Sequence, residues 1–385
     1  MTALDPGLTA LRIAAYALAF RVVSAILAFL SNVAFPLDQR EPFTMFGRTS
    51  PFWDPFARFD SGWYFGVARN GYEYVEGGRS NLAYFPVYPM LMRHVGRLFG
   101  PEASNVYLAG ILVSWTAFAL AMVVLYHLAR LDLPEDRARQ AVLLTAVFPF
   151  AFFFGVVYTE SLFLLFAVTG FYAFRRRWWV WGGLAAGLAT ATRVNGVVML
   201  PALAWLAWRT AKAEPRDRAL ALVGLALAAS GVGVYSLYVY SLSGNPFEWA
   251  ASIQRWGYYP GGSPLLAPFR LVRALVTHPY AFLAGERMGL YDTLNGLTAL
   301  AFAVSVPFVW KRFGAAYGLF MAANLWLHLS TGQYEGLGRY CSVMFPCFIW
   351  MASLRREAVP NALIVVFAMF YTLCLALFTT IHPLF

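Results

Sequence analysis

The chain has 385 residues, of which 60% are hydrophobic and 12% are charged, and its mean hydropathy is +0.59. The charged fraction is about half that of a typical soluble domain, which excludes a soluble globular protein. A net charge of +10 would suggest nucleic-acid binding in a soluble protein, but the basic residues here mostly lie at the ends of apolar segments. That placement favours membrane topology and contact with anionic lipids, and it predicts no nucleic-acid partner.

Apolar runs long enough to cross a bilayer recur along the whole chain, with no soluble block between them. We therefore predict a single all-α polytopic membrane domain over 1–385 with about eleven transmembrane helices. The predicted spans lie near 11–33, 105–129, 140–156, 160–174, 178–192, 194–208, 219–242, 289–310, 314–330, 339–353 and 360–381. We expect the first span to be retained, because no basic segment and small-residue cleavage site accompany it.

Basic residues mark alternate short loops of this arrangement. They cluster at 130–139, 175–177, 209–218, 311–312 and 355–356. If the spans alternate, all these loops lie on one side, and the positive-inside rule places them and the N-terminus in the cytoplasm. Two long loops, at 34–104 and 243–288, then lie on the extracytoplasmic face. Their Pro, Gly and aromatic content predicts ordered caps and interfacial helices, and we expect the chemistry on that face.

The first long loop holds the stretch 52–74, which sets Asp54 and Asp60 among aromatic rings and arginines. Both acids have a structural interpretation: Asp54 precedes a proline, as at a helix start, and Asp60 could cap a helix over 61–70 with Gly71 after its end. Both also have a functional one, because a carboxylate at an aromatic-rich membrane face has a tunable pKa and can serve as a general base. The spacing alone leaves the two interpretations open.

Three further charged residues lie at the outer ends of predicted spans. Glu160 enters an apolar segment, so it either faces a cavity in the bundle or complements a helix start capped by Thr159. Arg193 and Arg339 each stand against the positive-inside bias. Each could extend to lipid headgroups or bind a phosphate with its planar pair of donors.

The residues that most often hold metals form no recognisable site. The five histidines are scattered without metal-ligand spacing, and only His328, near the outer end of its span, is kept as a candidate. The three cysteines lie in the C-terminal apolar region and are interpreted as small buried hydrophobes. No cofactor is firmly implied, and we expect no dependence on a metal.

Four sequence motifs follow one another along the chain. In the first, Phe59-Asp60 is followed by Trp63-Tyr64 and Gly71-Tyr72. The others are a Phe-Pro-Val-Tyr-Pro segment at 85–89, a central motif covering 158–163 and 183–196, and Arg339-Tyr340 with Phe345-Pro346. Together they resemble the motifs of the second mannosyltransferase of GPI-anchor synthesis (the PIG-V-type family), which belongs to the GT-C membrane glycosyltransferases. Phe59 stands where tryptophan is commoner in that family.

The resemblance implies a GT-C-type helical bundle in the membrane. It also implies an inverting transfer of mannose, or a related sugar, from a polyprenyl-phosphate donor to a hydroxyl of a glycan, glycolipid or protein acceptor. Asp60 is then the expected general base. The expected substrate-binding residues are Asp54, Arg58, Tyr64, Tyr88, Glu160, Arg193, Asn195, Arg339 and Tyr340. Such a donor already carries a good leaving group, so a base and charge stabilisation can suffice.

Two other functions use the same residues. The first is a transporter or flippase of a lipid-linked sugar, which would bind phosphate with the outer arginines. The second is a membrane scaffold that has lost catalysis. One large loop after the first span and the lack of an internal repeat favour the enzyme over the transporter. The compact loops rich in Ala, Arg and Gly point to a prokaryotic inner or plasma membrane.

Overall fold

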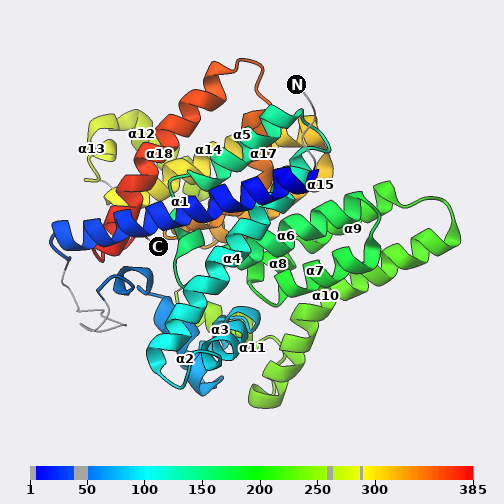
Figure 1. Ribbon diagram of the computed structural model, residues 1–385, viewed down its shortest axis with the longest axis horizontal. Helices are drawn as coiled ribbons and strands as arrows, with labels where there is room; N and C mark the ends of the chain where they lie inside the picture. Colours follow the sequence, from blue (N-terminus) through cyan, green and yellow to red (C-terminus); the bar gives the residue numbers. More distant parts are fainter. Residues whose placement is uncertain (1–5, 39–50, 258–262, 287–288, 385) are drawn as a thin grey trace.

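The computed structural model describes residues 6–38, 51–257, 263–286 and 289–384, and these form a bundle of helices (Figure 1). Within these described residues, five helices are long and apolar enough to cross a membrane. They are α1 (Pro6–Ala34), α4 (Ala103–Ala129), α10 (Pro215–Ser243), α14 (Leu290–Phe313) and α18 (Ala358–Thr379). They coincide with the predicted spans near 11–33, 105–129, 219–242, 289–310 and 360–381, which confirms an all-α fold of membrane type.

Shorter helices occupy most of the other predicted spans. They are α6 (Glu160–Arg175), α7 (Trp179–Thr190), α9 (Leu200–Thr210) and α15 (Ala315–Leu329). The predicted span at 194–208 starts with a separate turn, α8 (Val194–Val197), ahead of α9. The total of about eleven transmembrane helices therefore stays a prediction.

Two further predicted spans are also wrong as continuous helices. In place of 140–156, α5 (Glu135–Ala146) is followed by a 3-10 helix, η4 (Ala151–Gly155). In place of 339–353, the chain forms α16 (Leu337–Ser342) and α17 (Phe345–Ala352). Prolines explain both breaks, because Pro149 and Pro346 lack an N–H donor and their rings would clash with the carbonyl four residues earlier in a continuous helix.

The two long loops fold into short helices, as predicted. The first contains η2 (Asp54–Phe56), α2 (Ser61–Asn70), η3 (Asn81–Ala83) and α3 (Val87–Arg97). The second contains α11 (Glu248–Arg255), α12 (Leu266–Thr277) and α13 (Pro279–Leu283). In Figure 1, α2, α3 and α11 lie together at one end of the bundle. The indole nitrogen of Trp256, just after α11, donates to the Ser80 carbonyl at 3.2 Å and joins the two loops.

The basic loops gather at the C-terminal end of α6. Arg175 closes α6 and pairs with Asp132, and Arg137 pairs with Glu357 at 3.4 Å. Glu160 begins the same helix, about 22 Å away at 1.5 Å per residue. The bundle therefore has a basic end and, at the start of α6, a second polar region of different composition.

Helices α7 and α10 pack backbone against backbone. A Cβ atom added at Gly231 of α10 would lie 1.8 Å from the carbonyl oxygen of Gly187 in α7, so only glycine fits there. Small residues allow this close approach of helices in a membrane. The contact fixes the C-terminal end of α7, after which the chain turns at Arg193.

Candidate active site

A cavity of about 600 Å³ lies between α2, α8, α11, α15 and α16. Its wall is largely aromatic and aliphatic, with polar side chains at a few places. The polar members are Asp60, Tyr64, Tyr84, Thr192, Arg193, Asn195, Gln254, His328, Thr331, Glu335, Arg339 and Tyr340. Six of the ten predicted site residues are therefore brought to one cavity: Asp60, Tyr64, Arg193, Asn195, Arg339 and Tyr340.

Asp60 stands at the start of α2, which runs from Ser61 to Asn70 as predicted. Asp60 occupies the N-cap position and Gly71 ends the helix, as expected, but the Asp60 carboxylate makes no capping hydrogen bond, so the interpretation of its side chain as a cap is wrong. Oδ2 accepts from Arg339 Nη1 at 2.6 Å, and Oδ1 accepts from the Tyr84 hydroxyl at 3.2 Å. The carboxylate is thus free of the helix backbone and turned toward the cavity.

The start of α2 is anchored to the start of α6. The Asp60 N–H donates to the Tyr158 hydroxyl at 3.3 Å, and Ser61 Oγ donates to the Val157 carbonyl at 3.2 Å. Phe59, just before Asp60, has φ of 51°, a left-handed conformation that is uncommon for a bulky residue. Such backbone strain persists where the surroundings enforce it, often at functional sites.

Glu160 pairs with both outer arginines. Its side chain is fully buried, and Oε1 accepts hydrogen bonds from both Arg193 and Arg339. Thr159 makes no side-chain cap, so Glu160 is held by these ion pairs and faces the bundle interior. Removing one partner of such a buried pair would leave an uncompensated charge.

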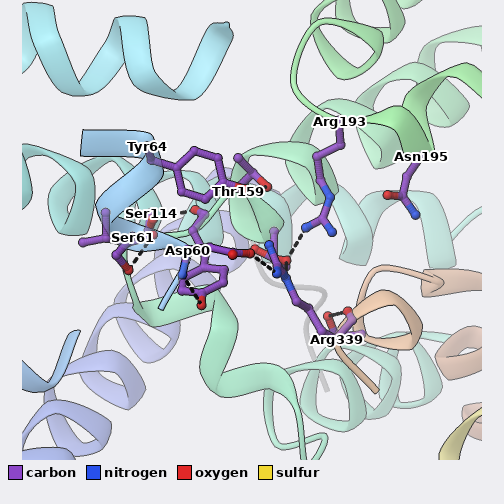
Figure 2. Close-up of polar contacts among 12 residues, drawn as sticks. Asp60, Ser61, Tyr64, Ser114, Thr159, Arg193, Asn195 and Arg339 are labelled. Carbon is purple, nitrogen blue, oxygen red and sulfur yellow. Dashed lines mark hydrogen bonds and ion pairs between the residues drawn. The ribbon is translucent and has the colours of Figure 1, made fainter. Parts of the chain in front are cut away.

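Arg193 and Arg339 do not extend to the lipid headgroups. Their side chains are 7% and 8% exposed, and both point into the site (Figure 2). Arg339 also lies over the Tyr158 ring, with its guanidinium carbon 4.4 Å from the ring centroid. With Asp60 and Glu160, the two arginines form a network of two positive and two negative charges at the cavity wall.

A polar cluster lies beyond Arg193. Asn195 Nδ2 donates to Asn324 Oδ1 at 2.7 Å and lies 3.0 Å from His328 Nε2. The His328 ring stacks on Tyr340, with an interplanar angle of 7°. His328 is a candidate from the sequence, whereas Asn324 was not predicted. The signal was available, because the two residues lie one turn apart on an apolar helix, where polar side chains are costly unless they serve a site.

Aromatic rings form another part of the wall. Trp63 stacks on Tyr84 with ring centroids 5.9 Å apart and meets Trp256 edge-on at 4.6 Å. Burial and the neighbouring carboxylate of Asp60 raise the pKa of Tyr84 far above its ordinary value, so its hydroxyl stays protonated and donates. Burial likewise raises the pKa of Tyr64 to about 12. Tyr84 and Trp256 were not predicted from the sequence, because neither belongs to a matched motif.

Four predicted site residues are not part of this wall: Glu160, which lies behind it and pairs with Arg193 and Arg339, and Asp54, Arg58 and Tyr88. Asp54 begins η2 and binds Arg58 Nη1 at 2.6 Å. Arg58 Nη2 also contacts Asn32 Oδ1 at 3.2 Å and the Thr379 carbonyl at 3.5 Å, which joins α1 to α18. Tyr88 donates to the Gly110 carbonyl at 3.0 Å, between α3 and α4. A direct substrate contact for Asp54, Arg58 or Tyr88 stays a prediction.

A second hollow of about 600 Å³ adjoins the first and shares Phe59 and Trp63 with it. Its other lining residues are Gly62, Gly66, Asn70, Gly71, Tyr72, Glu73 and Asn81. In the described ranges, no three His, Cys, Asp or Glu side chains gather in a way that would hold a metal ion. The expectation that the protein does not depend on a metal stays a prediction.

Comparisons with known proteins agree with this architecture. ArnT from Cupriavidus metallidurans, solved bound to undecaprenyl phosphate, has a TM-score of 0.52 and 15% identity over 96% of this chain and 77% of that one. The oligosaccharyltransferase of Archaeoglobus fulgidus, solved with zinc and sulfate, has a TM-score of 0.51 and 14% identity. That match covers 95% of this chain but 53% of the archaeal one, so the chain spans about half its length. No curated protein matches.

Such low identities show the fold alone, and they confirm the expected GT-C-type bundle. With its five apolar helices, the protein is an integral membrane protein. The model of the Mannosyltransferase (PIG-V) family matches residues 11–211, more than half of the chain. The matched segment includes Asp60 and Arg193, which line one cavity, and Glu160, which pairs with Arg193. The chain therefore belongs to the mannosyltransferase (PIG-V) family.

Proposed function

We propose that the protein is a membrane glycosyltransferase. It moves mannose, or a closely related sugar, from a polyprenyl-phosphate donor to an acceptor hydroxyl with inversion at the anomeric carbon, and Asp60 is the general base. The observation that carries the proposal is the convergence of the Asp60 carboxylate with Arg193 and Arg339 at one cavity. Family membership supports the choice of mannose.

The cavity suits a donor that is part lipid and part phosphate. Val194, Val197, Val198 and Leu327 give one part of its wall an aliphatic surface for the start of a polyprenyl chain. Arg193 and Arg339 supply the donors that a phosphate prefers. The ArnT structure holds undecaprenyl phosphate, which makes a similar lipid a reasonable donor here.

The donor phosphate would also prepare the base. Asp60 Oδ2 is bound to Arg339 at 2.6 Å, so this oxygen is occupied and cannot also bind an acceptor hydroxyl closely. A phosphate that takes over Arg339 weakens this ion pair. The acceptor oxygen then attacks the anomeric carbon and passes its proton to Asp60. The bond from that carbon to the phosphate oxygen breaks, and the arginines stabilise the departing phosphate.

The acceptor would approach through the second hollow. Phe59 and Trp63, which flank Asp60 in sequence, belong to the walls of both hollows, so the base lies between them. The side chains of Asn70, Glu73 and Asn81 make this hollow suitable for a hydroxylated glycan, glycolipid or glycosylated protein. Donor and acceptor would thus reach Asp60 from two sides.

The proposed location of the reaction is the extracytoplasmic face of a prokaryotic inner or plasma membrane. The basic loops gather at the opposite end of α6, and by the positive-inside rule that end belongs in the cytoplasm. The N-terminus would then be cytoplasmic as well.

The test is transfer from radiolabelled polyprenyl-phosphate-mannose by purified protein in detergent, with extracted membrane lipids as acceptor. We expect Asp60→Asn to lose transfer and to keep donor binding. Asp136→Asn, an exposed acid at the basic end, is the matched control and should keep both. Wild-type transfer rates in Asp60→Asn would refute the base, and bound donor that is never cleaved by the wild type would favour a flippase.

A further inference from the structure

The amide of Asn195 has an unsatisfied acceptor. Asn195 is fully buried and belongs to the cavity wall, and its Oδ1 has no hydrogen-bond partner among the described residues. A buried carbonyl oxygen without a donor costs free energy. Such an atom in a cavity wall is therefore a place where a bound ligand would supply a hydrogen-bond donor.

The orientation of this amide follows from its neighbours. Asn324 Nδ2 donates to the Phe320 carbonyl at 2.8 Å, so its Oδ1 is the atom that faces Asn195. Asn195 must therefore place its Nδ2 next to this oxygen, because the reversed amide would bring two oxygens into contact. The second proton of Nδ2 points to His328 Nε2 at 3.0 Å, which makes that nitrogen an acceptor. Both amide protons are thus used inside the protein, and Oδ1 is left over.

Only one part of the proposed donor can satisfy this oxygen. An ionised phosphate offers acceptors alone, and a polyprenyl chain offers no polar hydrogen. A sugar ring offers several hydroxyl donors. In Figure 2, Asn195 lies on the far side of Arg193 from Asp60, away from the atom that would deprotonate the acceptor hydroxyl.

We propose that Asn195 Oδ1 accepts a hydrogen bond from one hydroxyl of the transferred sugar and thereby selects the sugar. Asn324 and His328 are positioning residues that keep both Nδ2 protons occupied and leave Oδ1 as the unpaired atom of the amide. His328 is itself held by its stacking on Tyr340. The inference rests on the proposed function and adds to it the group that recognises the sugar.

The first test needs no mutation. Binding of polyprenyl-phosphate-mannose to the wild-type protein in detergent is compared with binding of four analogues that each lack one sugar hydroxyl, at C2, C3, C4 or C6. We expect one analogue to bind roughly tenfold more weakly than the parent lipid, because the hydroxyl that it lacks is the one that donates to Oδ1. Equal affinities for all four analogues and the parent lipid would overturn the proposal.

The second test assigns that hydroxyl to Asn195. Asn195→Leu should weaken binding of polyprenyl-phosphate-mannose about tenfold and leave bare polyprenyl phosphate unaffected. It should also bind the sensitive deoxy analogue as well as the parent lipid. His328→Phe, which keeps the stacked ring, should show part of the same loss. Asn361→Leu, an exposed position at the basic end, is the matched control and should show none.

These outcomes separate this inference from the proposed function. If Asn195→Leu weakens both lipids equally, Asn195 has a structural role and the inference fails while the donor assignment stands. If wild-type protein binds neither lipid, the proposed donor itself is wrong, and the sugar contact fails with it.

Discussion

Arg339 Nη1 lies 2.6 Å from the carboxylate of Asp60, although 279 residues separate the two in sequence. Through Nε the same guanidinium donates to Glu160. One side chain of the C-terminal half thus joins an acid of the first long loop to an acid at the start of α6. Both the electrostatics and the stability of the site depend on it.

Replacing Arg339 by methionine should destabilise the protein. Glu160 would lose one of its two cationic partners while fully buried, and breaking a buried ion pair costs about 3–5 kcal/mol. Thermal unfolding in detergent measures the loss. The double variant Arg339→Met/Glu160→Gln should recover part of it, because the uncompensated charge is gone. A double variant less stable than the sum of the two single changes would contradict this account.

Asp60→Asn should affect catalysis without affecting folding. Its side chain does not cap α2, and asparagine can still accept from Tyr84 or Arg339. We expect a loss of transfer of about 10²–10⁴-fold, the range typical of a lost general base. Thermal unfolding of the variant should match the wild type within a few degrees, on the order of the shift from 1 kcal/mol. A large drop in stability would show that Asp60 is structural.

Tyr84→Phe tests the second hydrogen bond of Asp60. Because burial and Asp60 raise the pKa of Tyr84, its hydroxyl should donate throughout the neutral and mildly alkaline range. Its removal should lower kcat/KM by about 5–10-fold, as for the loss of one hydrogen bond. The pH profile of the wild type up to about pH 10, the ordinary tyrosine pKa, should show no loss from ionisation of Tyr84. An alkaline limb near that pH that disappears in Tyr84→Phe would contradict the expectation.

Gly66→Leu tests the acceptor side. No atom lies within 4 Å of a Cβ built at Gly66, and Gly66 lines the second hollow, so a larger side chain there can extend into the hollow and narrow it. We expect transfer to fall and slow hydrolysis of the donor to persist. Gly233→Leu on α10, where a Cβ also meets nothing within 4 Å, is the control. Equal loss of transfer and hydrolysis in Gly66→Leu would remove the hollow from the acceptor path.

Gly231→Ala tests the packing that fixes the end of α7. Its Cβ would lie 1.8 Å from the Gly187 oxygen, so α7 and α10 must separate, and we expect a loss of about 1–3 kcal/mol from overpacking. Gly233→Ala, two residues further along the same helix, should be neutral or slightly stabilising. Thermal unfolding of the two variants side by side provides the measurement. Equal stability of both variants would contradict the packing argument.

The sequence by itself determined the membrane class, the GT-C-type fold and the motifs around Asp60, Glu160, Arg193 and Arg339. Composition and hydrophobic runs report burial in lipid directly, and the motifs report local turns such as the start of α2 at Ser61. The continuity of the helices was harder to predict from the sequence, because a single proline at 149 or 346 interrupts a helix even within a long apolar run.

The tertiary structure decided which polar residues share a cavity. Asp54 and Asp60 look alike in the sequence, yet one pairs with Arg58 beside α1 and α18, and the other meets Arg339 at the cavity. Asn324 joins the site because α15 packs beside α8. Contacts between segments far apart in the chain arise from helix packing, which depends on the whole bundle and not on local spacing.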